Sequence, residues 1–121
     1  MNKKYERYIN YIVNDIQAPY FKNMRDSYGL SPNEYELILS KVFNQPVNIQ
    51  GVYNDNYVYD NQYHKLYQES SNGFWVRYEY DKQGYITYHE DSTGYWVKYG
   101  YDYHGNEVYY EDSHGYIEDN R

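Results

Sequence analysis

Apolar residues near the start of the chain recur at helical spacing. Tyr, Ile and Val fall at steps of three and four along residues 5–16, which is the pattern of an amphipathic helix. Pro19 favours an end to that helix, since the residue before a proline tends to leave helical geometry. Pro19 also fits the first turn of a second short helix that ends near Gly29.

A third helix has the clearest start signal. In the stretch Ser31-Pro32-Asn33-Glu34, Ser31 fits an N-cap, Pro32 fits the first helical position and Glu34 fits a capping-box partner. Apolar residues then recur on one side of this helix, which is expected to end at residues 44–46, Asn-Gln-Pro. The first 46 residues are therefore predicted to form three helices, whose apolar faces need a packing partner.

From about residue 47 the apolar pattern changes to alternation, with many Val, Ile, Tyr and Trp residues. Alternation with these residue types predicts half-buried strands. Turn signals recur about every ten residues, as Asp-x-x-Gly or as Ser-x-Gly. The strands are expected near 47–53, 57–60, 64–69, 74–80, 85–90, 95–101 and 106–111.

The strand region repeats itself. Residues 69–89 align without a gap with residues 90–110, and Glu111 begins a third copy, so the period is 21 residues. An earlier, less regular copy covers 57–67, where Tyr63 takes the place of the turn glycine. That turn is expected to be built differently. The fold class predicted is α+β: three helices (residues 1–46) packed as one compact unit on an up-and-down antiparallel β-meander of 21-residue hairpin repeats (residues 47–121).

The odd period constrains the pairing. Side chains alternate between faces, so an odd shift moves a strand to the other face unless the two turn types differ by one residue in pairing. We expect that difference, which places Trp75 and Trp96 on one face and Tyr78 and Tyr99 on the other. The helices are expected to pack on the more apolar face, which carries Phe74, Val76, Tyr78 and Tyr80. The last repeat is expected to project as a single layer.

Composition narrows the function classes. The chain has 22 tyrosines and no cysteine. Tyrosine suits half-exposed sheet faces and binding surfaces, and the lack of cysteine rules out disulfides and thiolate sites. The N-terminus has no continuous apolar segment, so neither a signal peptide nor a membrane span is expected. These features predict a cytoplasmic location.

The charge is concentrated in the strand region. Residues 1–49 sum to +1 and residues 50–121 to −8, within a total of −7. An acidic surface repels nucleic acid and attracts basic protein grooves. Direct nucleic-acid binding is therefore disfavoured.

No catalytic or metal signature is present. The repeat replaces His89, His104 and His114 by other residue types at equivalent positions, and His64 stands apart, so metal ligation is not expected. Glu90 and Asp91 fit a strand end and a turn better than an acid/base pair. Ser71, Ser92 and Ser113 fit turns better than nucleophiles. We expect no catalysis and no cofactor.

The repeated aromatic and acidic residues favour a protein interface instead. Trp and Tyr dominate interface hot spots. Two carboxylate series, Asp60/Asp81/Asp102 and Glu69/Glu90/Glu111, are expected along the two sets of turns. Equally, these carboxylates could simply keep the sheet soluble. The predicted partner-binding residues are Trp75, Trp96, Tyr88, Tyr109, Glu79, Glu90, Asp91, Glu107, Glu111 and Asp112.

The stretch YEYDKQG at residues 78–84, with its copy ending at Gly105, resembles the YD repeat of Rhs-type bacterial proteins. The whole layout resembles small phage and prophage proteins in which a helical N-terminus precedes similar hairpins. That resemblance implies a phage accessory protein, such as an inhibitor of a host CRISPR nuclease, with a host protein as its partner.

Two other interpretations stay open. The order Gly-aromatic-Trp followed by Tyr-x-Tyr-Asp-x-x-Gly is similar to the choline- and glucan-binding repeats, which implies a carbohydrate or cell-wall module. A structural or assembly part of a phage particle is the third possibility, with the exposed sheet edge pairing between copies. The oligomeric state is open.

Overall fold

The computed structural model describes residues 10, 12–52 and 54–121. Of the first predicted helix, residues 10 and 12–15 are helical, while Tyr5, Tyr8 and Ile9 lie outside the described residues. Helix α2 (Tyr20–Lys22) continues as a π-helical turn (Asn23–Ser27), and α3 spans Pro32–Val42. Ser31 is the N-cap of α3 as predicted. Its hydroxyl makes no capping bond to a helix amide and instead donates to the Glu34 carboxylate at 2.9 Å.

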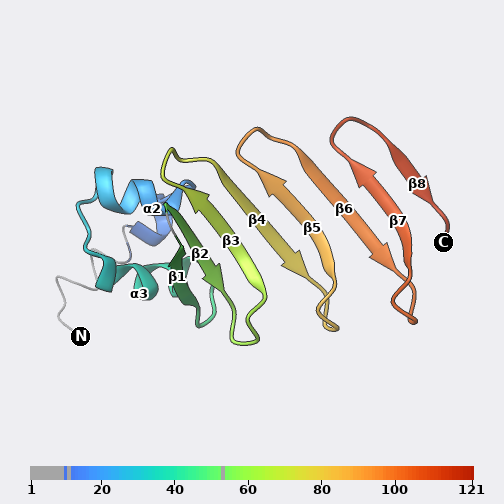
Figure 1. Ribbon diagram of the computed structural model, residues 1–121, viewed down its shortest axis with the longest axis horizontal. Helices are drawn as coiled ribbons and strands as arrows, with labels where there is room; N and C mark the ends of the chain where they lie inside the picture. Colours follow the sequence, from blue (N-terminus) through green and yellow to red (C-terminus); the bar gives the residue numbers. More distant parts are fainter. Residues whose placement is uncertain (1–9, 11, 53) are drawn as a thin grey trace.

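The remaining chain forms one antiparallel sheet of eight strands in sequence order, each paired with the next. The fold is thus α+β and mostly β, with an up-and-down meander (Figure 1). The final strand is the one that the sequence pattern did not predict. The strands are β1 (Asn48–Val52), β2 (Asp55–Tyr59), β3 (Lys65–Ser70), β4 (Trp75–Tyr80), β5 (Ile86–Asp91), β6 (Trp96–Tyr101), β7 (Glu107–Asp112) and β8 (Ile117–Asp119).

The two kinds of hairpin differ in pairing, as the odd spacing predicted. Hairpins closed by an Asp60-, Asp81- or Asp102-type turn carry a register shift near the turn, which leaves one extra residue on the second strand. The hairpins between them are regular. Because of this extra residue, equivalent positions in successive repeats stay on the same face of the sheet although the period is odd. The pairing accordingly places Trp75 and Trp96 on the same side of the sheet.

The helices lie on the face that carries the tryptophans, so the predicted assignment was wrong. The backbone amide of Phe21 in α2 donates to the Glu69 carboxylate, and Glu69 pairs with Trp75 across β3 and β4. Of the four residues predicted to face the helices, Tyr80 borders the core. We call the side with the tryptophans the helix-side face; its members include Ile49, Asn56, Val58, Tyr67, Glu69, Trp75, Arg77, Glu79, Tyr88, Glu90, Trp96, Lys98, Tyr109, Glu111 and Ile117.

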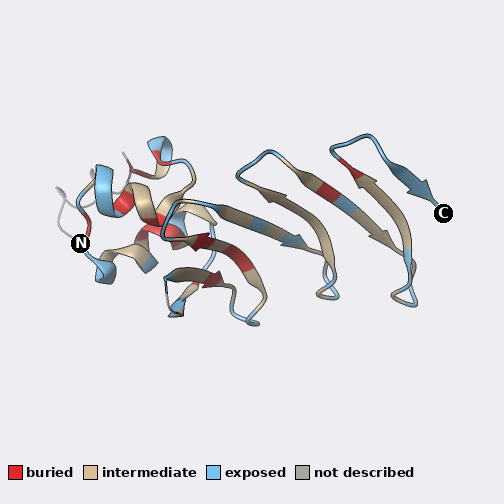
Figure 2. Ribbon diagram, turned by 45° about the horizontal axis from the view of Figure 1, so that its top comes forward, coloured by how far each residue is buried: buried red, intermediate tan, exposed pale blue. Residues whose placement is uncertain are grey.

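The described helices lie over the first strands. The core joins α2 and α3 to β1–β3, and the later strands continue away from it as a single layer to the C-terminus (Figure 1). Figure 2 shows buried residues gathered at the helical end. Val97 in β6 and Asp112 in β7 are also buried, away from that end. None of the residues that the structure describes therefore covers the helix-side face from β5 onward, as expected for the last repeat. Among the described residues, no helix has the length and apolar character that a membrane crossing requires.

The turn at Tyr63 has the same construction as the glycine turns, contrary to the prediction. Tyr63 has φ of 62°, and its amide donates to the carbonyl of Asp60 as the amide of Gly84 does to that of Asp81. The Asp60 carboxylate accepts from the amides of Gln62 and His64 at 2.8 and 2.9 Å. These bonds hold the backbone of Tyr63 in the left-handed conformation, which favours glycine.

Replacing Tyr63 with glycine is expected to raise the free energy of unfolding by about 1 kcal/mol, because it removes left-handed strain from a side chain that is 68% exposed. Urea denaturation followed by circular dichroism measures the change. Tyr103→Gly is the control, since Tyr103 is also an exposed turn tyrosine but is not among the residues with positive φ. Equal effects of the two changes would contradict the strain at Tyr63.

Candidate protein-binding face

A unit of three side chains recurs on the helix-side face, and its first copy supports a helix. Glu69 is 2% exposed and accepts hydrogen bonds from the amides of Phe21 (2.9 Å) and Lys22 (2.8 Å) and from the Tyr67 hydroxyl (2.6 Å). The amide of Tyr20 donates to the Tyr67 hydroxyl at 3.1 Å. A helix leaves its first amides without partners, and here a carboxylate and a phenol accept from them.

The chemistry of this first unit keeps Tyr67 a donor. Burial raises the pKa of the Tyr67 phenol well above its usual range, and the hydrogen bond to Glu69 raises it further. Trp75 completes the unit, with its ring stacked on Tyr67 at 6.2 Å between centroids and 25° between planes. We call Tyr67, Glu69 and Trp75 the first unit.

The second unit has the same geometry, and no helix of the described part of the chain lies above it. The Tyr88 hydroxyl donates to Glu90 at 2.7 Å, and the Tyr88 and Trp96 rings stack at 6.5 Å and 24°. Burial, followed by the bond to Glu90, raises the pKa of Tyr88. The Arg77 guanidinium lies across the strand pair, 3.3 Å from the Glu90 carboxylate. We call Tyr88, Glu90 and Trp96 the second unit.

The third unit is incomplete. The Tyr109 hydroxyl donates to Glu111 at 2.7 Å, and this bond raises the pKa of Tyr109. Ile117, which is 58% exposed, stands at the tryptophan position. The Arg121 guanidinium lies 4.2 Å from the centre of the Tyr109 ring. Only the second unit therefore offers the complete set of side chains on the uncovered part of this face among the described residues.

The structure brings most of the predicted binding residues together on one face. Trp75, Trp96, Tyr88, Tyr109, Glu79, Glu90 and Glu111 lie on the helix-side face. The pairing places Asp91, Asp112 and Glu107 opposite, because they pair with Val76, Val97 and Tyr101. These three residues belong to a different surface from the tryptophans.

The prediction that both carboxylate series lie at turns is confirmed for Asp60, Asp81 and Asp102 and wrong for the glutamates. Glu69, Glu90 and Glu111 are strand residues, and Glu69 is buried under α2. The turn carboxylates are Asp residues, and they bind their own turns: Asp81 accepts from the amides of Gln83 and Tyr85 at 2.9 and 3.0 Å. Asp102 accepts in the same way from His104 and Asn106. These aspartates build turns, whereas the glutamates are strand residues of the helix-side face, where Glu69 is buried.

Three contributors to this face were missed at the sequence level. Glu69 was read as a turn residue, although the spacing Tyr-x-Glu recurs at 67–69, 88–90 and 109–111 and could have signalled a shared bond. The cations were also missed. Lys98 lies 5.0 Å from the Trp96 ring centre, and Arg77 lies 5.9 Å from that of Tyr88.

The histidines have partners of other kinds. His64 lies 3.2 Å from the Asp60 carboxylate and stacks on Tyr80, and His89 lies 3.2 Å from the Tyr99 hydroxyl. Across the part of the chain that the structure describes, His, Asp and Glu side chains form no group of three that could hold a metal ion.

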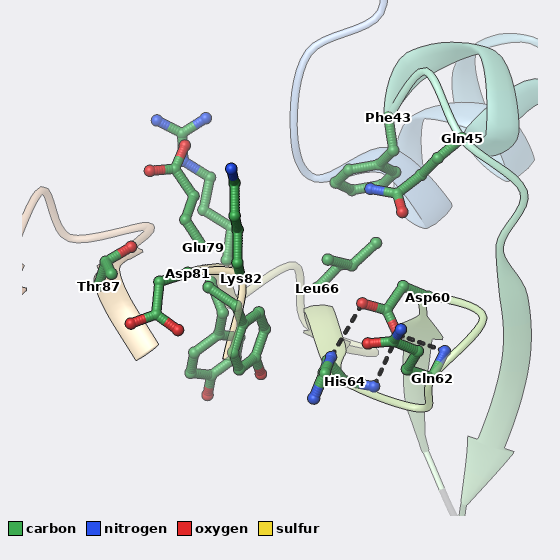
Figure 3. Close-up of a pocket in the computed structure, with 13 residues that line it drawn as sticks. Phe43, Gln45, Asp60, Gln62, His64, Leu66, Glu79, Asp81, Lys82 and Thr87 are labelled. Carbon is green, nitrogen blue, oxygen red and sulfur yellow. Dashed lines mark hydrogen bonds and ion pairs between the residues drawn. The ribbon is translucent and has the colours of Figure 1, made fainter. Parts of the chain in front are cut away.

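An open polar groove of about 750 Å³ marks the step where the helical layer ends (Figure 3). Phe43 and Gln45 line it from the helical side, and Arg77 and Glu79 line it from the helix-side face. The remaining lining residues are Asp60, Gln62, His64, Leu66, Tyr78, Tyr80, Asp81, Lys82 and Thr87. The groove therefore borders the uncovered face beside Tyr88, the cross-strand partner of Glu79.

The turn aspartates predict a loss of stability in acid. Burial opposes ionisation of Asp60, but bonds from the His64 and Gln62 amides outweigh it and lower the pKa. The backbone amide of Asn106 likewise lowers the pKa of Asp102, and the Thr93 hydroxyl lowers the pKa of Asp91. A carboxylate with a lowered native pKa stabilises the fold fully above its unfolded pKa of 3.8, and that stabilisation is lost as pH falls through the native pKa.

The thermal midpoint is therefore expected to be nearly flat from pH 7 to about pH 5 and to fall below about pH 4. Circular dichroism melts across this range provide the measurement. Asp60→Asn keeps an acceptor for the turn and should make the acid loss shallower. A midpoint that stays constant to pH 2 would contradict this account of the turns.

No known family model matches this chain, and no curated protein matches it.

Proposed function

We propose that this chain is a non-catalytic protein-binding module, encoded by a phage, that inhibits a host defence protein in the host cytoplasm by covering a basic nucleic-acid-binding surface. The observation that carries the proposal is the uncovered helix-side face, where the second unit presents an ordered tyrosine, glutamate and tryptophan within an acidic sheet. CRISPR-type nucleases are the partner class that the resemblance to phage proteins favours.

The aromatic residues supply the contact energy in this proposal. Tyrosine and tryptophan bury large areas with few rotatable bonds, and they dominate interface hot spots. The Tyr88 ring is already stacked on Trp96, and its hydroxyl is already bonded to Glu90, before any partner arrives. Less conformational entropy is lost when such side chains are ordered in advance.

The charge supplies the attraction. The −8 of residues 50–121 would steer a basic groove toward the sheet. The helix-side face itself is mixed, because Arg77 and Lys98 lie among its carboxylates. Long-range steering thus comes from the whole sheet, and the specific contact comes from the second unit.

Binding and cleavage assays with a purified CRISPR-type nuclease test the proposal. Binding should weaken as salt rises from 50 to about 500 mM, because the salt screens the attraction, and nucleic-acid cleavage should fall as the complex forms. The double change Glu90→Lys with Glu111→Lys should weaken binding about tenfold or more.

A matched control separates the face from net charge. Glu107→Lys with Glu118→Lys changes the net charge equally, but both residues lie on the opposite face, paired with Tyr101 and Tyr110. The control pair should retain most of the affinity. Salt-insensitive binding, or equal losses for the two pairs, would count against the helix-side face as the contact surface.

A further inference from the structure

We propose that the second unit receives the N-terminus of an α-helix from the partner protein, as the first unit receives the N-terminus of α2. The inference rests on the proposed function in one respect: the partner is a nucleic-acid-handling protein. The helix end would be one whose free amides otherwise bind a phosphate, and the Glu90 carboxylate would take the place of that phosphate.

The first unit shows what this arrangement binds. Every one of the first three amides of α2 has an acceptor in it: Tyr20 on the Tyr67 hydroxyl, and Phe21 and Lys22 on the two oxygens of Glu69. The side chains of the same turn lie on the aromatic ring, with Tyr20 at 4.8 Å and Phe21 at 6.2 Å from Tyr67 between centroids. The unit therefore recognises a helix start that carries aromatic side chains.

The second unit repeats the recognition geometry and is open. Its Tyr–Glu bond is 2.7 Å against 2.6 Å in the first, and its ring stack is 6.5 Å and 24° against 6.2 Å and 25°. The turns beside the two units show that α2 lies next to the first unit and that the equivalent space beside the second unit is open. A Cβ at Gly73 would lie 3.3 Å from Lys22 of α2, whereas a Cβ at the equivalent Gly94 would meet nothing within 4 Å.

The cross-strand neighbours differ between the two units. Asn56 and Val58 pair with Glu69 and Tyr67, while Arg77 and Glu79 pair with Glu90 and Tyr88. Arg77 occupies one oxygen of Glu90, but its side chain is 46% exposed. An exposed ion pair of this kind contributes little free energy, so a helix end can displace Arg77 toward water.

The charge of the helix start decides the kind of partner. A carboxylate is stabilised by the partial positive charge of a helix N-terminus, which is also why phosphates bind there. A second copy of this chain offers the start of α3, but Glu34 lies in its first turn. That negative charge would oppose Glu90, so a helix start without acidic residues, on a different protein, fits the second unit better.

A helical peptide serves as the probe. The peptide is acetylated, held helical by a lactam bridge between its second and third turns, and begins Ala-Pro-Tyr-Phe-Lys, the sequence of residues 18–22 at the start of α2. In titrations of the full-length chain, followed by the indole N–H signals of its two tryptophans, the Trp96 signal should shift saturably and the Trp75 signal should move less. A peptide with N-methylated first-turn amides should bind at least about tenfold more weakly, because it lacks the donors.

Variants of the chain identify the acceptor. Glu90→Gln should weaken peptide binding about tenfold, while Glu118→Gln on the opposite face should leave it unchanged. Arg77→Asn, which recreates the neighbour of the first unit, should tighten binding. Equal affinity for the two glutamine variants, or for the N-methylated peptide, would overturn the inference.

The nuclease assays and the peptide titrations can fail separately, so the proposed function and the helix-docking inference are tested independently. If the peptide binds the second unit but no nuclease is inhibited, the helix-docking site stands and the proposed partner class is wrong. If a nuclease is inhibited and both that inhibition and peptide binding survive Glu90→Gln, the proposed function stands and the helix-docking inference is wrong.

Discussion

Replacing Glu69 with alanine is expected to lower the free energy of unfolding by about 3 kcal/mol or more. The change leaves the amides of Phe21 and Lys22 and the hydroxyl of Tyr67 without their acceptor in a site where Glu69 is 2% exposed. A buried donor without a partner costs about 1–3 kcal/mol. Urea denaturation monitored by circular dichroism and tryptophan fluorescence gives the value.

The repeat supplies the matched control for this change. Glu90 makes the same bond to its tyrosine, but its side chain is 26% exposed and accepts no helix amides. Glu90→Ala should therefore cost less than about 1 kcal/mol. If the two alanine variants lose equal stability, Glu69 does not act as the anchor of α2.

Replacing Phe21 with alanine is expected to cost about 3–5 kcal/mol, the usual range for a large aromatic residue removed from a core. Phe21 is 1% exposed, and its ring packs against those of Tyr35 and Tyr67 at 5.7 and 6.2 Å between centroids. The lost contacts would leave a cavity between α2, α3 and β3. The same urea experiment measures this loss.

Phe74 is the control for Phe21, because it is 42% exposed and lies in the turn before β4. Phe74→Ala should change the free energy of unfolding by no more than about 0.5 kcal/mol. A large loss at Phe74 together with a small loss at Phe21 would mean that the helices do not pack on β1–β3 as described.

Local features of this fold were predictable from the sequence. The strands β4–β7 lie within one residue of their predicted bounds, because alternation and turn chemistry act over a few residues. The shared face of Trp75 and Trp96 followed from the odd period together with the expectation that the two turn types differ by one residue in pairing. Such inferences need no knowledge of what packs against the sheet.

Features that depend on tertiary packing were not predictable in the same way. The helices pack on the face with Trp75 because Glu69 and Tyr67 bind the start of α2. A glutamate gives no sequence signal that it will be buried. Tyr63 adopts a left-handed conformation because the Asp60 carboxylate holds the turn amides. In both places a hydrogen-bonding network outweighed the local preference of the residue.

Fluorine NMR of the chain labelled with 5-fluorotryptophan tests the central claim most directly, because Trp75 borders the core and Trp96 lies in the open second unit. When a purified CRISPR-type nuclease binds, the Trp96 signal is expected to move to a new chemical shift, while the Trp75 signal stays near its position in the free chain. A complex that forms and inhibits the nuclease while the Trp96 signal keeps its free chemical shift would contradict the claim that this face binds the partner.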